Sequence, residues 1–216
     1  FIGVWVSCLI VPDRGHPGEG HPHLSIGRLI RRPEILFFLA ACVLMQASHG
    51  AYYAFYSIYL GHHGYGSTAV GALWALGVGI EVVVFLRMHR LLERFGARQM
   101  LLLSLALATL RWLLIGFFIE LVAVQVVAQT LHAFSFGAFH AAAIHLTHHY
   151  FPGRTQGRGQ ALYNSAGFGV GGAIGSSVSG ALWSSTGPVV TFVVASSMAA
   201  LGWLAAYRHV DRQRRY

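Results

Sequence analysis

The arginines of this chain lie almost entirely in alternate gaps between long apolar stretches. All 15 residues of the Lys and Arg class are arginines, and 14 of them fall in residues 12–34, 87–98, 148–160 and 208–216. The intervening gaps hold none, and these are residues 61–67, 119–120 and 184–187. Short loops rich in arginine stay on the cytoplasmic side of a membrane. The alternation therefore predicts a multi-pass membrane protein with arginine-rich cytoplasmic loops.

Composition excludes an ordinary soluble domain. Hydrophobic residues make up 55% of the chain and charged residues only 10%, whereas soluble domains carry about 25% charged residues. The formal charge of +8 does not indicate nucleic-acid binding, because it is divided among short loops rather than gathered on one face. It orients the chain against an anionic inner leaflet instead. Arginine without lysine, beside abundant Ala and Gly, is typical of GC-rich bacteria, so we expect a bacterial inner membrane.

Six apolar stretches are long enough to span a bilayer as helices, which takes about 20 residues. They are residues 35–60, 68–86, 100–118, 121–147, 161–183 and 188–207. These runs lack the alternation of strands, and backbone groups in lipid are satisfied only in helices or closed barrels. We therefore expect an all-α membrane protein with a six-helix transmembrane domain at residues 35–207.

The ends of the chain differ from this domain. Residues 1–11 are apolar, but a helix of that length spans only ~16 Å, about half of the hydrocarbon core. We expect them to end a truncated transmembrane helix, so that the chain is a fragment lacking an N-terminal half. Residues 12–34, rich in Gly, Pro, His and Arg, are expected to form a basic cytoplasmic linker, and residues 208–216 a basic cytoplasmic tail.

Several segments carry a family resemblance. They are SHGAYYAFYSIYL (48–60), GYG (64–66), AVGALWALGVGIEVVVF (69–85), RLLERFGARQMLL (90–102), LRWLLIG (110–116), QTLHAFSFGAFHAAAIH (129–145) and GQALYNS (159–165). Together they resemble the phenylpropionic acid permease group of the major facilitator superfamily. The resemblance covers nearly all of residues 33–207. It implies the C-terminal six-helix half of a secondary transporter that works by alternating access.

Two full charges, Glu81 and Arg111, lie inside expected spans. Each costs about 2.5–3.5 kcal/mol at a helix centre, and pairing reduces that cost, so the simplest inference is that they meet. Glu81 lies ~8 Å and Arg111 ~17 Å above the inner ends of their helices, so long side chains or a water must bridge the difference. The alternatives are a purely structural ion pair, or an Arg111 that extends to the outer surface.

Other polar and aromatic residues are expected near the same depth. His49 and His132 lie level with Arg111, and histidine can exchange a proton near neutral pH; the alternative is a histidine hydrogen-bonded within the bundle. Gln129 could bind substrate or hold helices together. Three aromatic residues either line a site for an aromatic substrate or serve packing and the interfacial belt. They are Tyr52, Tyr53 and Trp74.

The fifth stretch contains small residues at helical spacing. Gly167, Gly171 and Gly175 form overlapping GxxxG pairs, which permit close approach of two helix backbones. A nucleotide-binding loop is a poor interpretation of these glycines, because no strand precedes them. We expect them to form a helix-packing surface.

The resemblance implies a proton-coupled symporter of a small organic acid, with an aromatic acid as one candidate. In the lactose permease, which is similar in fold, a Glu on helix eight, an Arg on helix nine, and a His and a Glu on helix ten link substrate and proton. Glu81, Arg111 and His132 fall on the corresponding helices, although helix ten here lacks an acidic residue. Arg111, or protonated His49 and His132, would attract the carboxylate, and Glu81 would carry the proton.

The expected partners are the substrate, protons, the lipid bilayer and the missing N-terminal half. We expect neither a metal nor a cofactor; the linker histidines and the group at 145, 148 and 149 are better explained by a solvated loop and a cationic helix end. Two other classes stay open. One is a non-transporting membrane receptor or assembly factor. The other is an intramembrane enzyme with a serine nucleophile at 176, 177 or 179.

Overall fold

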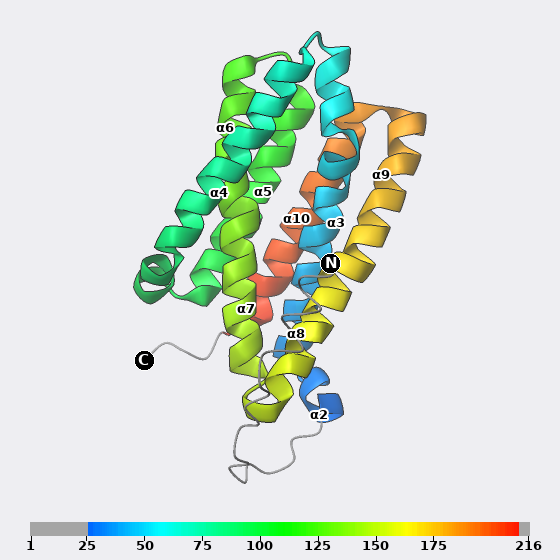
Figure 1. Ribbon diagram of the computed structural model, residues 1–216. Coiled ribbons are helices and arrows are strands. Elements are labelled where there is room, and N and C mark those ends of the chain that lie inside the picture. The colour runs from blue at the N-terminus through cyan, green and yellow to red at the C-terminus, as the bar shows by residue number, and fades with distance from the viewer. Residues whose placement is uncertain (1–25, 212–216) are drawn as a thin grey trace, which may run out of the picture.

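The computed structural model describes residues 26–211 as a bundle of helices (Figure 1). The expected helix end at 1–11, most of the linker with its histidines, and residues 212–216 of the tail lie outside the described residues. The elements are α2 (Ile26–Ile30), α3 (Pro33–His62), α4 (Ser67–Phe95), α5 (Ala97–Phe117), α6 (Val122–His132), η1 (Ala133–Ala138), α7 (Phe139–Tyr150), η2 (Gly153–Thr155), α8 (Gln156–Asn164), η3 (Ser165–Gly171), α9 (Gly172–Thr186) and α10 (Pro188–His209).

Five helices within the described residues are long and apolar enough to cross a membrane. They are Pro33–His62, Ser67–Phe95, Ala97–Phe117, Val122–Tyr150 and Pro188–His209. These match five of the six expected spans and confirm the all-α membrane fold. The remaining expected span, 161–183, lies within the helical path from α8 to α9, but it is not among the five because Gly and Ser make much of it less apolar.

The arginine-rich gap at 87–98 is mostly helix rather than loop. α4 continues nine residues beyond the expected end at residue 86, to Phe95, because Arg, Leu, Met and Glu are all good helix formers. The chain turns only at Gly96, whose φ of 79° is a left-handed conformation that glycine adopts without a steric penalty. α5 begins at the next residue.

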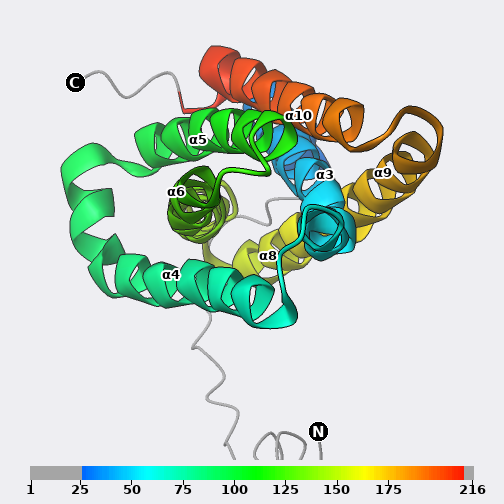
Figure 2. The same ribbon diagram turned by 90° about the horizontal axis from the view of Figure 1, so that it is seen from above.

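α3 is the central helix, and it packs between α10 on one side and α9 with η3 on the other. α6 lies between α4 and α5, as the view along the bundle shows (Figure 2). α4 and α5 therefore make few direct contacts with each other. This arrangement decides which of the buried polar side chains can meet.

The close approach of α3 and α9 depends on glycine. A Cβ at Gly175 would lie 2.6 Å from Cα of Ala47, and one at Gly171 would lie 2.6 Å from the carbonyl oxygen of Val43. No side chain fits at such distances. A Cβ at Gly167 would make only an ordinary contact, 3.5 Å from Gln46 Cγ. Two of the three glycines expected to pack helices thus lie where only glycine fits.

Two segments are π-helical, which the sequence did not predict. η1 (Ala133–Ala138) interrupts the helix formed by α6 and α7, and η3 (Ser165–Gly171) interrupts the helix formed by α8 and α9. Short π-helical turns are rare and occur frequently at functional sites. η1 contacts the polar centre described below through Phe136 and Gly137, and η3 reaches η1 through the ring contact of Phe168 with Phe136.

Candidate functional site

Arg111 on α5 is completely buried. Its Nε donates a hydrogen bond to the carbonyl oxygen of Ala128 on α6 at 2.9 Å. The guanidinium carbon lies 4.1 Å from the ring centre of Tyr52 and 4.5 Å from that of Trp112, within the range of cation–π attraction. Nη1 and Nη2 have no hydrogen-bond partner within residues 26–211. Arg111 is therefore a buried cation whose two terminal nitrogens have no hydrogen-bond partner among the described residues. The alternative expectation, an arginine that extends to the outer surface, is wrong.

The expected ion pair between Glu81 and Arg111 does not form in the described part of the chain. Glu81 Oε2 instead lies 3.7 Å from Nε2 of His132, an ion pair when this histidine is protonated. The physical reason is the position of α6: it stands between α4, which carries Glu81, and α5, which carries Arg111. The different heights of Glu81 and Arg111 along their helices also keep the two side chains apart.

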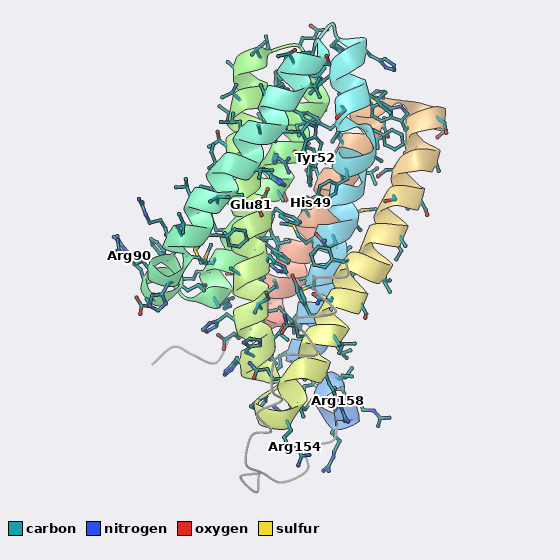
Figure 3. All side chains as sticks on the ribbon, in the orientation of Figure 1. His49, Tyr52, Glu81, Arg90, Arg154 and Arg158 are labelled. Atoms are coloured by element: carbon teal, nitrogen blue, oxygen red, sulfur yellow. The ribbon has the colours of Figure 1, made fainter. Side chains whose placement is uncertain are left out.

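His49 and His132 are both buried, with 1% and 4% of their surface exposed. Nδ1 of His49 donates to the carbonyl oxygen of Met45 at 2.9 Å, and its Nε2 has no partner among residues 26–211. The two imidazole centres are 6.3 Å apart, too far for a direct hydrogen bond between them. Nδ1 of His132 also lacks a partner in the described structure. Figure 3 shows His49, Tyr52 and Glu81 together near the middle of the bundle.

Tyr52 connects these groups. Its hydroxyl donates to Oε1 of Gln129 at 2.9 Å, and its ring packs 5.4 Å from that of His132 and 4.6 Å from that of Trp74. Nε2 of Gln129 has no partner among the described residues. Gly77 on α4 lies directly against this carboxamide, where a Cβ would be 2.9 Å from Oε1.

Tyr53 lies differently from its neighbour. It is half exposed, and its ring lies 6.3 Å from that of Trp74 and 6.2 Å from that of Phe136. Trp74 is held by a hydrogen bond from Nε1 to Ser57 Oγ at 3.0 Å. These partly exposed rings form an aromatic edge beside the buried centre.

Sequence reasoning missed two rings of this site. Trp112 donates from Nε1 to Ser48 Oγ at 3.1 Å and meets the edge of His49 at 4.8 Å. Phe136 stacks on His132 at 5.3 Å. The signals were present, since Trp112 follows Arg111 directly and Phe136 stands four residues after His132, on the same helix face.

The arrangement can bind an anion and can hold a proton nearby. The unpartnered nitrogens of Arg111, Gln129, His49 and His132 are buried around the Tyr52 and Trp112 rings. Among residues 26–211, Glu81 is the one carboxylate that approaches this group, and it forms an ion pair with His132 when that histidine is protonated. No set of three His, Cys, Asp or Glu residues that could hold a metal exists within 26–211. In the same range, the one serine–histidine contact joins Ser48 Oγ to His49 Nδ1 at 3.5 Å, and the serines at 176, 177 and 179 make none.

Comparisons with known proteins agree with a transport function. Residues 12–194 match the family model described as the MFS_1 like family. A stretch of 107 residues, 50% of the chain, is 42% identical to an Escherichia coli (strain K12) protein named "Probable 3-phenylpropionic acid transporter". The matched part spans 28% of the length of that relative.

Proposed function

This chain belongs to the MFS_1 like family of the major facilitator superfamily, and we propose from that premise that it is part of a carrier that symports a small organic acid with protons. The family is one of membrane transporters, and the five long apolar helices make the chain a multi-pass membrane protein. One observation carries the substrate proposal: the buried guanidinium of Arg111 has both terminal nitrogens free within the described structure.

A carboxylate fits this site better than a neutral ligand. A buried charge without a partner is unfavourable by several kcal/mol, and water can satisfy its donors but not neutralise it. The two oxygens of a carboxylate accept hydrogen bonds from Nη1 and Nη2 in parallel. Nε2 of Gln129 supplies a further donor close to Tyr52. The bound acid would therefore complete the hydrogen bonding of groups that the fold leaves open.

The aromatic edge favours an acid that carries a ring. The Tyr53 ring lies 6.3 Å from that of Trp74 and 6.2 Å from that of Phe136, and all three rings are only partly covered. A phenyl group attached to the carboxylate through a short chain could pack there while the carboxylate reaches Arg111. The name of the Escherichia coli relative, which includes 3-phenylpropionic acid, supports this choice of substrate.

Glu81 and His132 are the groups we assign to the proton. Glu81 is the more accessible partner, with 15% of its side chain exposed against 5% for His132. Protonation of Glu81 neutralises its carboxylate and therefore abolishes the ion pair with His132. Glu81 also packs against η1 at Gly137. The contact is so close that a Cβ added at Gly137 would lie 2.9 Å from Glu81 Cγ. Protonation would thus change the contact between α4 and η1 and bias one state of the transport cycle.

We assign the arginine-rich end of the bundle to the cytoplasm of a bacterial inner membrane. The turn after α4, the connection from α7 to α8 and the end of α10 lie toward the same end (Figure 1). Arg90, Arg154 and Arg158 mark this half of the molecule (Figure 3). Cytoplasmic loops carry an excess of arginine, so the linker and the C-terminus would be cytoplasmic as well.

Glu81→Gln in the full-length protein tests the proposed function. We expect loss of uptake driven by a proton gradient, because glutamine cannot exchange a proton, while exchange of labelled for unlabelled 3-phenylpropionate continues. Glu93→Gln is the matched control, since Glu93 lies on the same helix but is exposed and pairs with His89 at 3.2 Å. Uphill uptake that is unchanged by Glu81→Gln would refute the assignment.

Gly77→Ala is expected to weaken substrate binding without removing any polar group. The new methyl group would displace the Gln129 carboxamide, and loss of one hydrogen bond to a charged ligand corresponds to roughly tenfold in affinity. The expected result is a higher KM with little change in maximal rate. Gly79→Ala is the control, because nothing lies within 4 Å of a Cβ there. Equal KM values for the two variants would contradict a role for Gln129.

A further inference from the structure

A cavity lies at the arginine-rich end of the bundle, apart from the Arg111 site. Its volume is about 1000 Å³. The turn from α4 to α5, the end of α7 and the end of α10 line it. None of the residues around Arg111 takes part. The proposed transport mechanism therefore gives this cavity no role.

The lining is cationic. Two arginines, Arg98 and Arg208, line it against one acidic residue, Asp211, and the remaining polar lining includes His145, His149 and His209. Arg98 is held in place by hydrogen bonds from Nε to the carbonyl oxygen of Val210 at 2.8 Å and from Nη2 to that of Tyr207 at 2.9 Å. An anion is thus the ligand that this charge distribution favours.

The first turn of α5 adds backbone donors to the same wall. Gly96, Ala97, Arg98 and Gln99 all line the cavity. The N-cap position, Gly96, supplies no side-chain hydrogen bond to the first N–H groups of this 21-residue helix. The start of a long helix attracts phosphate through these N–H groups and its dipole. The N-terminus of α5 therefore adds to the positive potential of the arginines that line the same cavity.

Exposed aromatic rings stand beside the cationic groups. Phe95 is 44% exposed and Tyr207 is 52% exposed, and both line the cavity. The guanidinium carbon of Arg98 lies 5.7 Å from the Tyr207 ring, and that of Arg94 lies 5.3 Å from the Phe95 ring. Aromatic residues gather where a bilayer meets water. A ligand with both an anionic head and an apolar body matches this combination better than a free phosphate ion.

We propose that this cavity binds the phosphate of an anionic phospholipid. Arg98, Arg208 and the first N–H groups of α5 contact the phosphate, and Phe95 and Tyr207 contact the start of the acyl chains. Basic pockets between transmembrane helices on the cytoplasmic side hold acidic lipid headgroups in this way. The site joins three helices at one end of the bundle, and it is independent of the proposed transport substrate.

The test is lipid binding to the full-length protein in detergent, followed by native mass spectrometry. Phosphatidylglycerol, phosphatidylcholine and inorganic phosphate are titrated separately. We expect phosphatidylglycerol to bind more tightly than the other two. Arg208→Gln should weaken it about fivefold, the effect of one basic residue at a lipid surface. Arg158→Gln is the charge-matched control, because Arg158 is exposed at the same end but does not line the cavity.

Arg98→Gln provides a second variant, and its melting temperature is measured as well because Arg98 also holds the end of α10. A photoreactive phosphatidylglycerol should cross-link to peptides containing residues 95–99 and 207–211. The proposal is overturned if phosphatidylcholine binds equally well, or if Arg208→Gln and Arg158→Gln behave alike. It is also overturned if inorganic phosphate binds as tightly as the lipid.

Discussion

Replacing Arg111 with glutamine in the full-length protein is expected to weaken substrate binding by about a hundredfold or more. Glutamine cannot supply the charge or the two parallel donors that a carboxylate accepts. Uptake and exchange of labelled 3-phenylpropionate should both be lost, unlike in Glu81→Gln, where exchange continues. Equilibrium binding to the purified protein measures the effect directly. Arg111→Lys should recover only part of the affinity, because an ammonium group keeps the charge but lacks the planar fork.

Thermal stability separates this role from a purely structural one. Arg111 makes one described hydrogen bond, to Ala128, and has no acidic partner within residues 26–211. Removing a buried cation of this kind leaves no opposite charge unpaired, so Arg111→Gln should melt at or above the temperature of the parent protein. A variant that loses stability but keeps its affinity for the substrate would show that Arg111 serves the fold.

Gly175→Leu is expected to prevent the protein from folding. Even a Cβ at this position would lie 2.6 Å from Ala47 Cα on α3, and a Cβ at Gly50 would lie 2.6 Å from the carbonyl oxygen of Gly175. Overpacking by a few methylene groups costs about 1–3 kcal/mol in a core that can adjust, and here the neighbour is backbone. Leucine therefore requires α3 and α9 to separate along their contact.

Gly172→Leu is the matched control, because nothing lies within 4 Å of a Cβ at that residue of the same helix. Size-exclusion chromatography and melting temperature in detergent compare the two variants. We expect aggregation or a large fall in melting temperature for Gly175→Leu alone. Similar profiles for both variants would contradict the close packing of α3 and α9.

The overall fold could be predicted because lipid imposes long apolar helices. Five of the expected spans are confirmed, with ends that differ by a few residues in most cases. The main exception is α4, which runs on to Phe95 through residues expected to form a loop. Hydropathy marks where a helix leaves the hydrocarbon, but not where it ends. The turn itself depends on Gly96. The family resemblance was confirmed as well.

Residue counting along the helices predicted which side chains of the candidate site lie close together, but not which of them pair. Counting residues along each helix placed Arg111, His49 and His132 at a common level. In the structure, Trp112 contacts Arg111 and His49, and Tyr52 contacts Arg111 and His132. The count could not show that α6 separates Glu81 from Arg111. The rotation of each helix about its axis, and the helices that surround it, are determined by packing. Packing also determines that Trp112 and Phe136 line the site.

The two π-helical segments give this chain a tolerance to changes in length that regular helices lack. Deleting one residue from an α-helix turns everything that follows by ~100° about the axis, which would swing Gly175 away from α3. A π-helical turn holds one residue more than the α-helical turn it replaces. A deletion within Ser165–Gly171 can therefore close the segment into a regular helix and leave Gly175 in place. In evolutionary terms, these segments are where the loss of a single residue is least damaging.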